Sequence, residues 1–110
     1  MVIISGKVIG KVQGVMFRQT FIRCLIAKKM EGGATNSAND SNEVTFTISG
    51  KKEIIDKVLL RIQSLPELNS WGATVSQLVI LDKVIPVEFH EVTTSNVDNF
   101  KWSPNVTFYL

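Results

Sequence analysis

Residues 10 to 18 read GKVQGVMFR, and they lie between two segments of different hydrophobic periodicity. Residues 2–12 alternate with a period of two, which predicts a half-buried strand, and the glycines at 6 and 10 suggest a bulge, a bend or a close backbone approach. From residue 17 onward apolar side chains recur at helical spacing, which predicts a helix over 17–30 that is stopped by the glycines at 32 and 33. GKVQGVMFR is therefore the connection from a strand to a helix.

This connection has features that are typical of an anion-binding site. A strand that ends in glycine and leads into a helix leaves several backbone N–H groups without partners at the helix N-terminus. The N–H groups from Gly14 to Arg18 are expected to converge on one small space, and the Arg18 guanidinium can grip two phosphate oxygens at once. Glycine before a helix is common, so the spacing alone favours a simple turn followed by a solvated arginine.

The remaining patterns predict the fold class. They indicate a short strand over 34–36, a longer strand over 44–49, a second helix over 51–64 and a further strand over 71–84. The order strand, helix, strand, strand, helix, strand (βαββαβ) is typical of the ferredoxin-like split βαβ sandwich. In this α+β fold an antiparallel sheet carries two helices on one face.

The segment after Pro86 extends the chain at its C-terminal end, and its pattern is ambiguous. A short strand at 87–92 and a terminal strand at 106–110 both fit the sequence, and the pattern does not decide which of them pairs with the main sheet.

Length and composition predict a single globular domain over residues 1–110. The chain is 45% hydrophobic and 20% charged, with a formal net charge of +2. Its lysines and arginines are scattered, so a small anionic ligand fits better than nucleic acid. Met1 is followed by neither a basic region nor a long apolar run, so we expect no signal peptide, no membrane span and a cytoplasmic location. We also expect the protein to be a monomer.

The single cysteine and the single histidine do not indicate thiol or metal chemistry. Cys24 falls at an apolar helical position and is expected to pack as a small hydrophobic residue. His90 is expected to be structural or exposed. With one histidine, one cysteine and dispersed carboxylates, the sequence predicts no metal site, and it implies no cofactor.

The chain resembles the acylphosphatase family over about residues 2–84. The family is marked by the arrangement GxVQGVxFR, which is matched here by Gly10, Val12, Gln13, Gly14, Val15, Phe17 and Arg18. The resemblance implies that this loop and its arginine bind the phosphate of an acyl phosphate. The implied phosphate-binding residues are Gln13, Gly14, Val15, Met16, Phe17 and Arg18.

A second signature of the family is matched in part. Its front half is met by Gly32, Ala34 and Asn36. Gly33 stands where the family has an aromatic residue, Asn42 stands where it has a turn glycine, and the loop after Asn36 is longer. By resemblance Asn36 is the catalytic residue that orients the attacking water, and the longer loop makes Asn39 a rival for this role.

The family resemblance also bears on the C-terminal segment. Residues 106–109 look like the closing strand of the family. If they are that strand, residues 86–104 form an insertion in front of it.

The implied function is metal-free hydrolysis of acyl phosphates to a carboxylate and inorganic phosphate. Arg18 and the loop N–H groups would hold the phosphoryl oxygens, and Asn36 would orient the water. One alternative is a non-catalytic phosphate- or partner-binding domain that keeps the anion loop but has lost the water site. Another is a ferredoxin-like RNA binder, which needs aromatic side chains on the exposed sheet face, where Thr45, Thr47 and Ser49 are expected instead.

Overall fold

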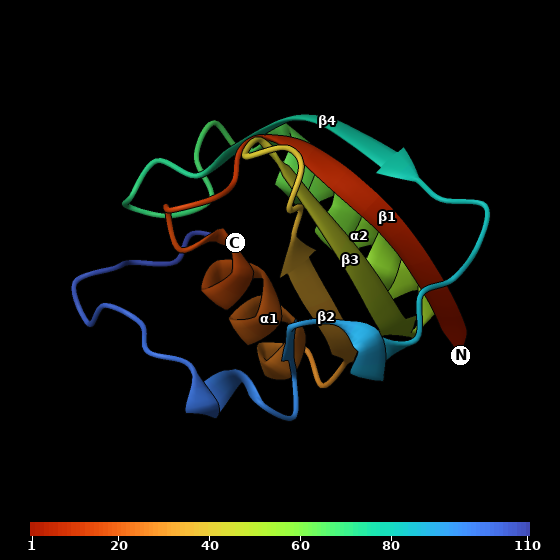
Figure 1. Cartoon of the computed structure of the whole chain (residues 1–110). Helices are drawn as coiled ribbons and strands as arrows, with labels where there is room; N and C mark the ends of the chain where they lie inside the picture. Colours follow the sequence, from red (N-terminus) through yellow and green to blue (C-terminus); the bar gives the residue numbers. More distant parts are fainter.

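The computed structural model describes all residues from 1 to 110 and shows one five-stranded antiparallel sheet with two helices (Figure 1). The sheet order is β4-β1-β3-β2-β5, and the chain order β1-α1-β2-β3-α2-β4 is the predicted ferredoxin-like βαββαβ arrangement. The strands are β1 Val2–Lys11, β2 Glu31–Asn36, β3 Glu43–Gly50, β4 Thr74–Ile80 and β5 Val92–Thr93. The helices are α1 Phe17–Ala27 and α2 Lys52–Ser64, with short 3-10 helices η1 Val87–Phe89 and η2 Val97–Asn99. The predicted fold class is confirmed.

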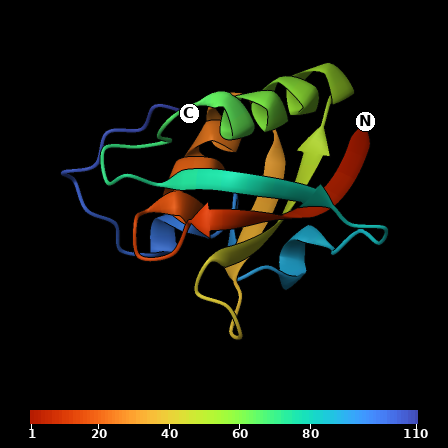
Figure 2. The same ribbon diagram turned by 90° about the horizontal axis from the view of Figure 1, so that it is seen from above.

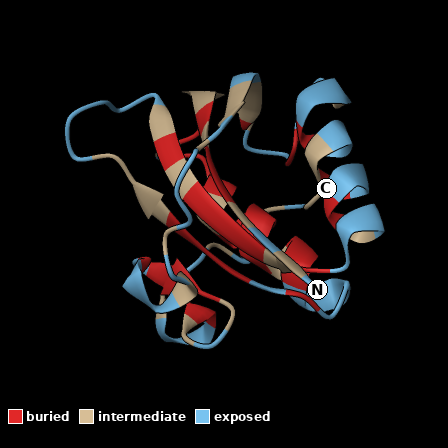
Figure 3. Ribbon diagram, turned by 90° about the vertical axis from the view of Figure 1, so that its right-hand side faces the viewer, coloured by how far each residue is buried: buried red, intermediate tan, exposed pale blue.

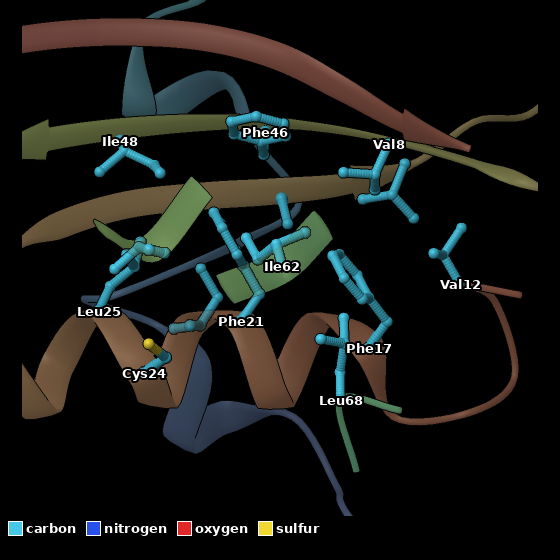
Figure 4. Packing of buried hydrophobic residues seen from close by; sticks show 14 of the residues in the cluster. Val8, Val12, Phe17, Phe21, Cys24, Leu25, Phe46, Ile48, Ile62 and Leu68 are labelled. Carbon is cyan, nitrogen blue, oxygen red and sulfur yellow. The ribbon is translucent and has the colours of Figure 1, made fainter. Parts of the chain in front are cut away.

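Apolar side chains at helical and strand spacing meet between the helices and the sheet. Phe21 of α1 packs against Phe17 with ring centroids 5.9 Å apart and against Phe46 of β3 at 5.4 Å (Figure 4). The inner face of α2 buries Ile55, Val58 and Ile62, while its outer face is exposed (Figure 3). Both helices therefore attach to the sheet by one apolar stripe, as amphipathic helices do.

The predicted stop of the first helix is wrong. The helix α1 ends at Ala27, and Lys29 takes the left-handed conformation, with φ 59°. Gly32 and Gly33 lie inside β2. They are needed there for space, because a Cβ at Gly32 would come within 2.4 Å of the Leu25 side chain and a Cβ at Gly33 within 2.6 Å of His90 Cβ.

The C-terminal segment also differs from the expectation. The fifth strand is Val92–Thr93, which pairs with residues 33 and 34 of β2 at the sheet edge. Residues 106–110 lie outside the sheet, where Phe108 forms an isolated bridge with Asn69. Residues 86–104 thus contain the edge strand and are not an insertion in front of it.

The sheet face away from the helices is covered in part by the connection from β4 to β5. Figure 2 shows η1 on the opposite side of the sheet from α2. Thr47, expected on an exposed face, is fully buried there: its hydroxyl donates to the Ile85 carbonyl oxygen at 2.7 Å and contacts His90 Nε2 at 2.7 Å. The exposed polar face predicted for this strand is therefore wrong at its centre.

His90 is a buried, structural side chain. Its Nδ1 lies 2.9 Å from Thr35 Oγ1 and its Nε2 contacts Thr47 Oγ1. Because Thr47 already donates its proton to Ile85, Nε2 carries a proton and donates it to Thr47, while Nδ1 accepts from Thr35. Burial lowers the pKa of His90 from its ordinary value of 6.5, which favours the neutral imidazole.

We expect this neutral histidine to make the fold less stable in mild acid. Below about pH 6.5 the unfolded chain binds a proton at His90 more readily than the folded chain does, so the free energy of unfolding decreases as the pH falls. Urea unfolding at pH 7.5 and pH 5.5 measures this loss. A His90→Gln variant should lose less stability between the two pH values than the wild type, and an equal loss in both proteins would contradict the assignment.

Candidate functional site

The connection from β1 to α1 turns sharply because two residues adopt positive φ. Gly14 has φ 75°, which only glycine adopts without strain, and Met16 has φ 60° and ψ 25° at the N-cap of α1. A left-handed methionine costs on the order of 1–2 kcal/mol. Such strain in a loop is typical of functional sites, where the surrounding structure holds an unfavourable backbone in place.

The backbone N–H groups of residues 14 to 19 donate no hydrogen bond within the chain. The first bond into the helix runs from the Thr20 N–H to the Met16 carbonyl oxygen, at 3.0 Å. A row of unpaired N–H groups at a helix N-terminus carries a partial positive charge and favours an anion. The loop predicted from the sequence therefore has the donors of an anion site.

Asn69 holds this loop from inside the core. Its Nδ2 donates to the Val15 carbonyl oxygen and to Thr20 Oγ1, both at 2.8 Å, and its Oδ1 accepts from the N–H groups of Trp71 and Ala73. Asn69 is fully buried, so these four bonds satisfy its amide. The sequence offered no signal for this residue, because the partners that it holds at the loop, Val15 and Thr20, lie about fifty positions away along the chain.

The Gln13 side chain forms hydrogen bonds to the hairpin between β2 and β3, and it does not line the pocket described below. Its Nε2 donates to the carbonyl oxygens of Ser37, Asp40 and Glu43 at 3.2, 3.0 and 2.9 Å. The side chain expected to bind phosphate is thus engaged elsewhere. It ties the anion loop to the hairpin that begins with Asn36.

Asn36 is the last residue of β2 and lies in the same pocket as Arg18. Its Oδ1 is buried and accepts no hydrogen bond from the chain. Leaving a buried polar atom unpaired costs about 1–3 kcal/mol, so a donor from a bound molecule would stabilise this amide. The rival residue Asn39 is exposed in the turn and does not line the pocket.

Arg18 forms an ion pair with Glu91, which precedes β5. The Arg18 side chain is 28% exposed and the Glu91 side chain 52% exposed, so the pair is open to solvent. The Glu91 N–H donates to Thr35 Oγ1 at 3.0 Å, next to Asn36. Sequence reasoning missed Glu91, since nothing in the local pattern links it to a helix far upstream.

The pocket between the loop, β2 and the C-terminal segment has a volume of about 170 Å³. Among the predicted phosphate-binding residues, Gly14, Met16, Phe17 and Arg18 line it, whereas Gln13 and the buried Val15 do not. Two residues that the sequence did not suggest, Phe100 and Lys101, also line it. The pocket thus combines an arginine, a lysine, an asparagine and apolar walls.

A model of the acylphosphatase family matches residues 4–94. This chain belongs to the acylphosphatase family. The resemblance seen in GKVQGVMFR is thereby confirmed. The comparison with curated proteins gave no match.

Two solved acylphosphatase structures share the fold. The acylphosphatase from Coxiella burnetii is 24% identical, with a TM-score of 0.60 over 82% of this chain and 86% of its own. The acylphosphatase from Bacillus subtilis is 19% identical, with a TM-score of 0.60 over 74% of this chain and 83% of its own. At these identities the likeness establishes the acylphosphatase fold.

The structure gives a physical reason for one departure from the acylphosphatase signature. By the family resemblance an aromatic residue is expected at the position of Gly33, and the space beside it is filled by His90, whose Cγ lies 2.9 Å from where a Cβ would be. The histidine covers this part of the sheet from the β4–β5 connection. A side chain at position 33 has no room beside His90, and Asn36 lies at the end of the strand.

Neither a metal cluster nor a reactive thiol is formed in this acylphosphatase fold. No group of three or more histidine, cysteine, aspartate or glutamate side chains lies close enough to hold a metal ion. Cys24 is buried in the core, and burial raises the pKa of its thiol. No helix here combines the length and the hydrophobicity that crossing a membrane requires.

Proposed function

We propose that this protein hydrolyses acyl phosphates to a carboxylate and inorganic phosphate, with no metal or other cofactor. The observation that carries the proposal is one pocket lined by Arg18, by Asn36 and by residues of the loop whose N–H groups are unpaired. Family membership supports the same reaction class. We also propose that the protein acts as a cytoplasmic monomer on a small molecule, without nucleic acid or membrane partners.

Substrate binding rests on the loop. The N–H groups of residues 14 to 19 and the positive end of α1 attract the phosphoryl oxygens, and the Arg18 guanidinium supplies two parallel donors. These donors are fixed by the backbone before substrate arrives, since Asn69 and Thr20 hold Val15 and Met16 in place. Preorganised donors of this kind stabilise the negative charge of a phosphoryl transition state.

The chemical step needs a placed water more than a strong base. The Asn36 side-chain amide hydrogen-bonds to the water and directs the water lone pair at phosphorus. The water oxygen forms a bond to phosphorus, the bond from phosphorus to the acyl oxygen breaks, and the carboxylate leaves with the electron pair. One water proton passes to a phosphoryl oxygen and the other stays on the attacking oxygen, so the products are a carboxylate and dihydrogen phosphate, which then releases a proton to solvent.

The test is turnover of benzoyl phosphate by the wild-type protein in buffer containing a chelator. We expect benzoate and phosphate to be released in equal amounts, and we expect added inorganic phosphate to inhibit the reaction competitively. Phosphate binding without turnover would instead favour the non-catalytic binding domain. The absence of both turnover and phosphate binding would contradict the assignment of this pocket as a phosphate site.

The ion pair between Arg18 and Glu91 gives a further prediction. The Glu91 carboxylate competes with a phosphate for the guanidinium, so a Glu91→Gln variant should bind inorganic phosphate more tightly. An exposed ion pair is worth about 0.2–1 kcal/mol, which corresponds to a gain of up to about fivefold in affinity. Calorimetric titration with phosphate measures the gain.

The matched control is Asp56→Asn. Asp56 pairs with Lys52 on α2 at 2.8 Å, and its side chain is 56% exposed, so this variant removes an equal charge away from the pocket lining. Its phosphate affinity should stay within twofold of the wild type. Weaker phosphate binding by Glu91→Gln would mean that Glu91 orients Arg18 and does not compete for it.

A further inference from the structure

The family match ends at residue 94, and the residues beyond it run alongside α1 (Figure 1). Arg23 of α1 anchors this extension at two points, by the ion pair to Asp98 and by its guanidinium lying 5.4 Å from the ring centroid of Trp102. Trp102 in turn stacks on Phe108, with centroids 5.7 Å apart. The extension is therefore held in a defined path beside the helix that carries Arg18.

This path brings Phe100 and Lys101 to the pocket. Phe100 is half-buried and packs against the hydrophobic core. Lys101 is exposed, and its ammonium forms no ion pair within the chain, whereas Arg18 is paired with Glu91. A segment outside the family match thus adds an apolar wall and an unpaired positive charge to the site.

We propose that Phe100 and Lys101 are specificity-determining residues that select acyl phosphates whose acyl group is apolar and carries a second negative charge. This inference rests on the proposed function, and it names the substrate class within it. The charge of the phosphoryl group is already matched by Arg18 and the row of N–H groups. The charge of Lys101 is additional, so it complements a second anionic group on the same ligand.

Two stable phosphonates test this preference without turnover. Benzylphosphonate carries the phosphonate alone, and 4-(phosphonomethyl)benzoate carries an added carboxylate on the ring. We expect the wild type to bind the carboxylated ligand more tightly. In the Lys101→Gln variant this ligand should bind about threefold to fivefold more weakly, while benzylphosphonate should change by less than twofold.

The control is Lys57→Gln, which removes an exposed lysine of α2 that does not line the pocket. It should leave both affinities unchanged. An equal loss for both ligands in Lys101→Gln, or no loss for either, would overturn the proposal. Because these affinities do not depend on turnover of benzoyl phosphate, failure of the selectivity and failure of the hydrolase function are distinguishable.

Discussion

Replacement of Arg18 by alanine should lower kcat/KM for benzoyl phosphate by about a hundredfold to a thousandfold. Removing one preorganised donor to a charged transition state typically has an effect of this size. Arg18 supplies the only guanidinium that lines the pocket. Steady-state hydrolysis of benzoyl phosphate by the purified variant measures the loss.

Two controls separate this loss from unfolding. The Arg18 pair with Glu91 is open to solvent, so its removal should change the free energy of unfolding by less than about 1 kcal/mol in urea. An Arg18→Lys variant keeps the charge but loses the planar pair of donors, and should have intermediate activity. If Arg18→Ala keeps more than a tenth of the wild-type rate while folded, the phosphate does not bind where we propose.

Replacement of Asn36 by alanine should lower kcat by about a hundredfold and leave phosphate affinity nearly unchanged, since Asn36 is assigned to the water. The variant should be at least as stable as the wild type, because the Asn36 Oδ1 that it removes is buried and unpaired. Kinetics on benzoyl phosphate, phosphate titration and urea unfolding together check these three statements.

The matched control for Asn36 is Asn39→Ala. Asn39 lies three residues further along the hairpin, is exposed and does not line the pocket, so its removal should leave kcat unchanged. Full activity in Asn36→Ala with a loss in Asn39→Ala would transfer the role to Asn39. A loss in both variants would point to the hairpin as a whole.

The fold could be predicted from the sequence where local periodicity and burial agree. The alternation of β1 and β3 and the apolar stripes of both helices each follow from one buried face. The prediction failed where tertiary contacts override local rules. Gly32 and Gly33 resemble a helix stop, yet they lie in a strand. Glycine is needed at these strand positions because Leu25 and His90 occupy the space beside them.

Some residues of the candidate site are likewise indicated by local sequence motifs, and others are not. Arg18, Asn36 and the loop were predicted from motifs that are local in sequence. Arg18, Asn36 and most of the loop line one pocket, and their roles stay predictions. The contacts of Gln13 and Asn69 were not found, because each binds carbonyl groups on segments remote in the chain. Lys101 was missed for another reason: a lone lysine in a polar segment carries no signal until the fold places it at a pocket.

The central claim is that water attacks the phosphorus of an acyl phosphate in this pocket. Hydrolysis of benzoyl phosphate by the wild-type protein in water enriched in ¹⁸O tests it directly, with mass spectrometry of both products. We expect one ¹⁸O atom in the released phosphate and none in the benzoate. Label in the benzoate would show attack at the carbonyl carbon and would contradict the roles assigned to Arg18 and Asn36, and the absence of hydrolysis would contradict the function itself.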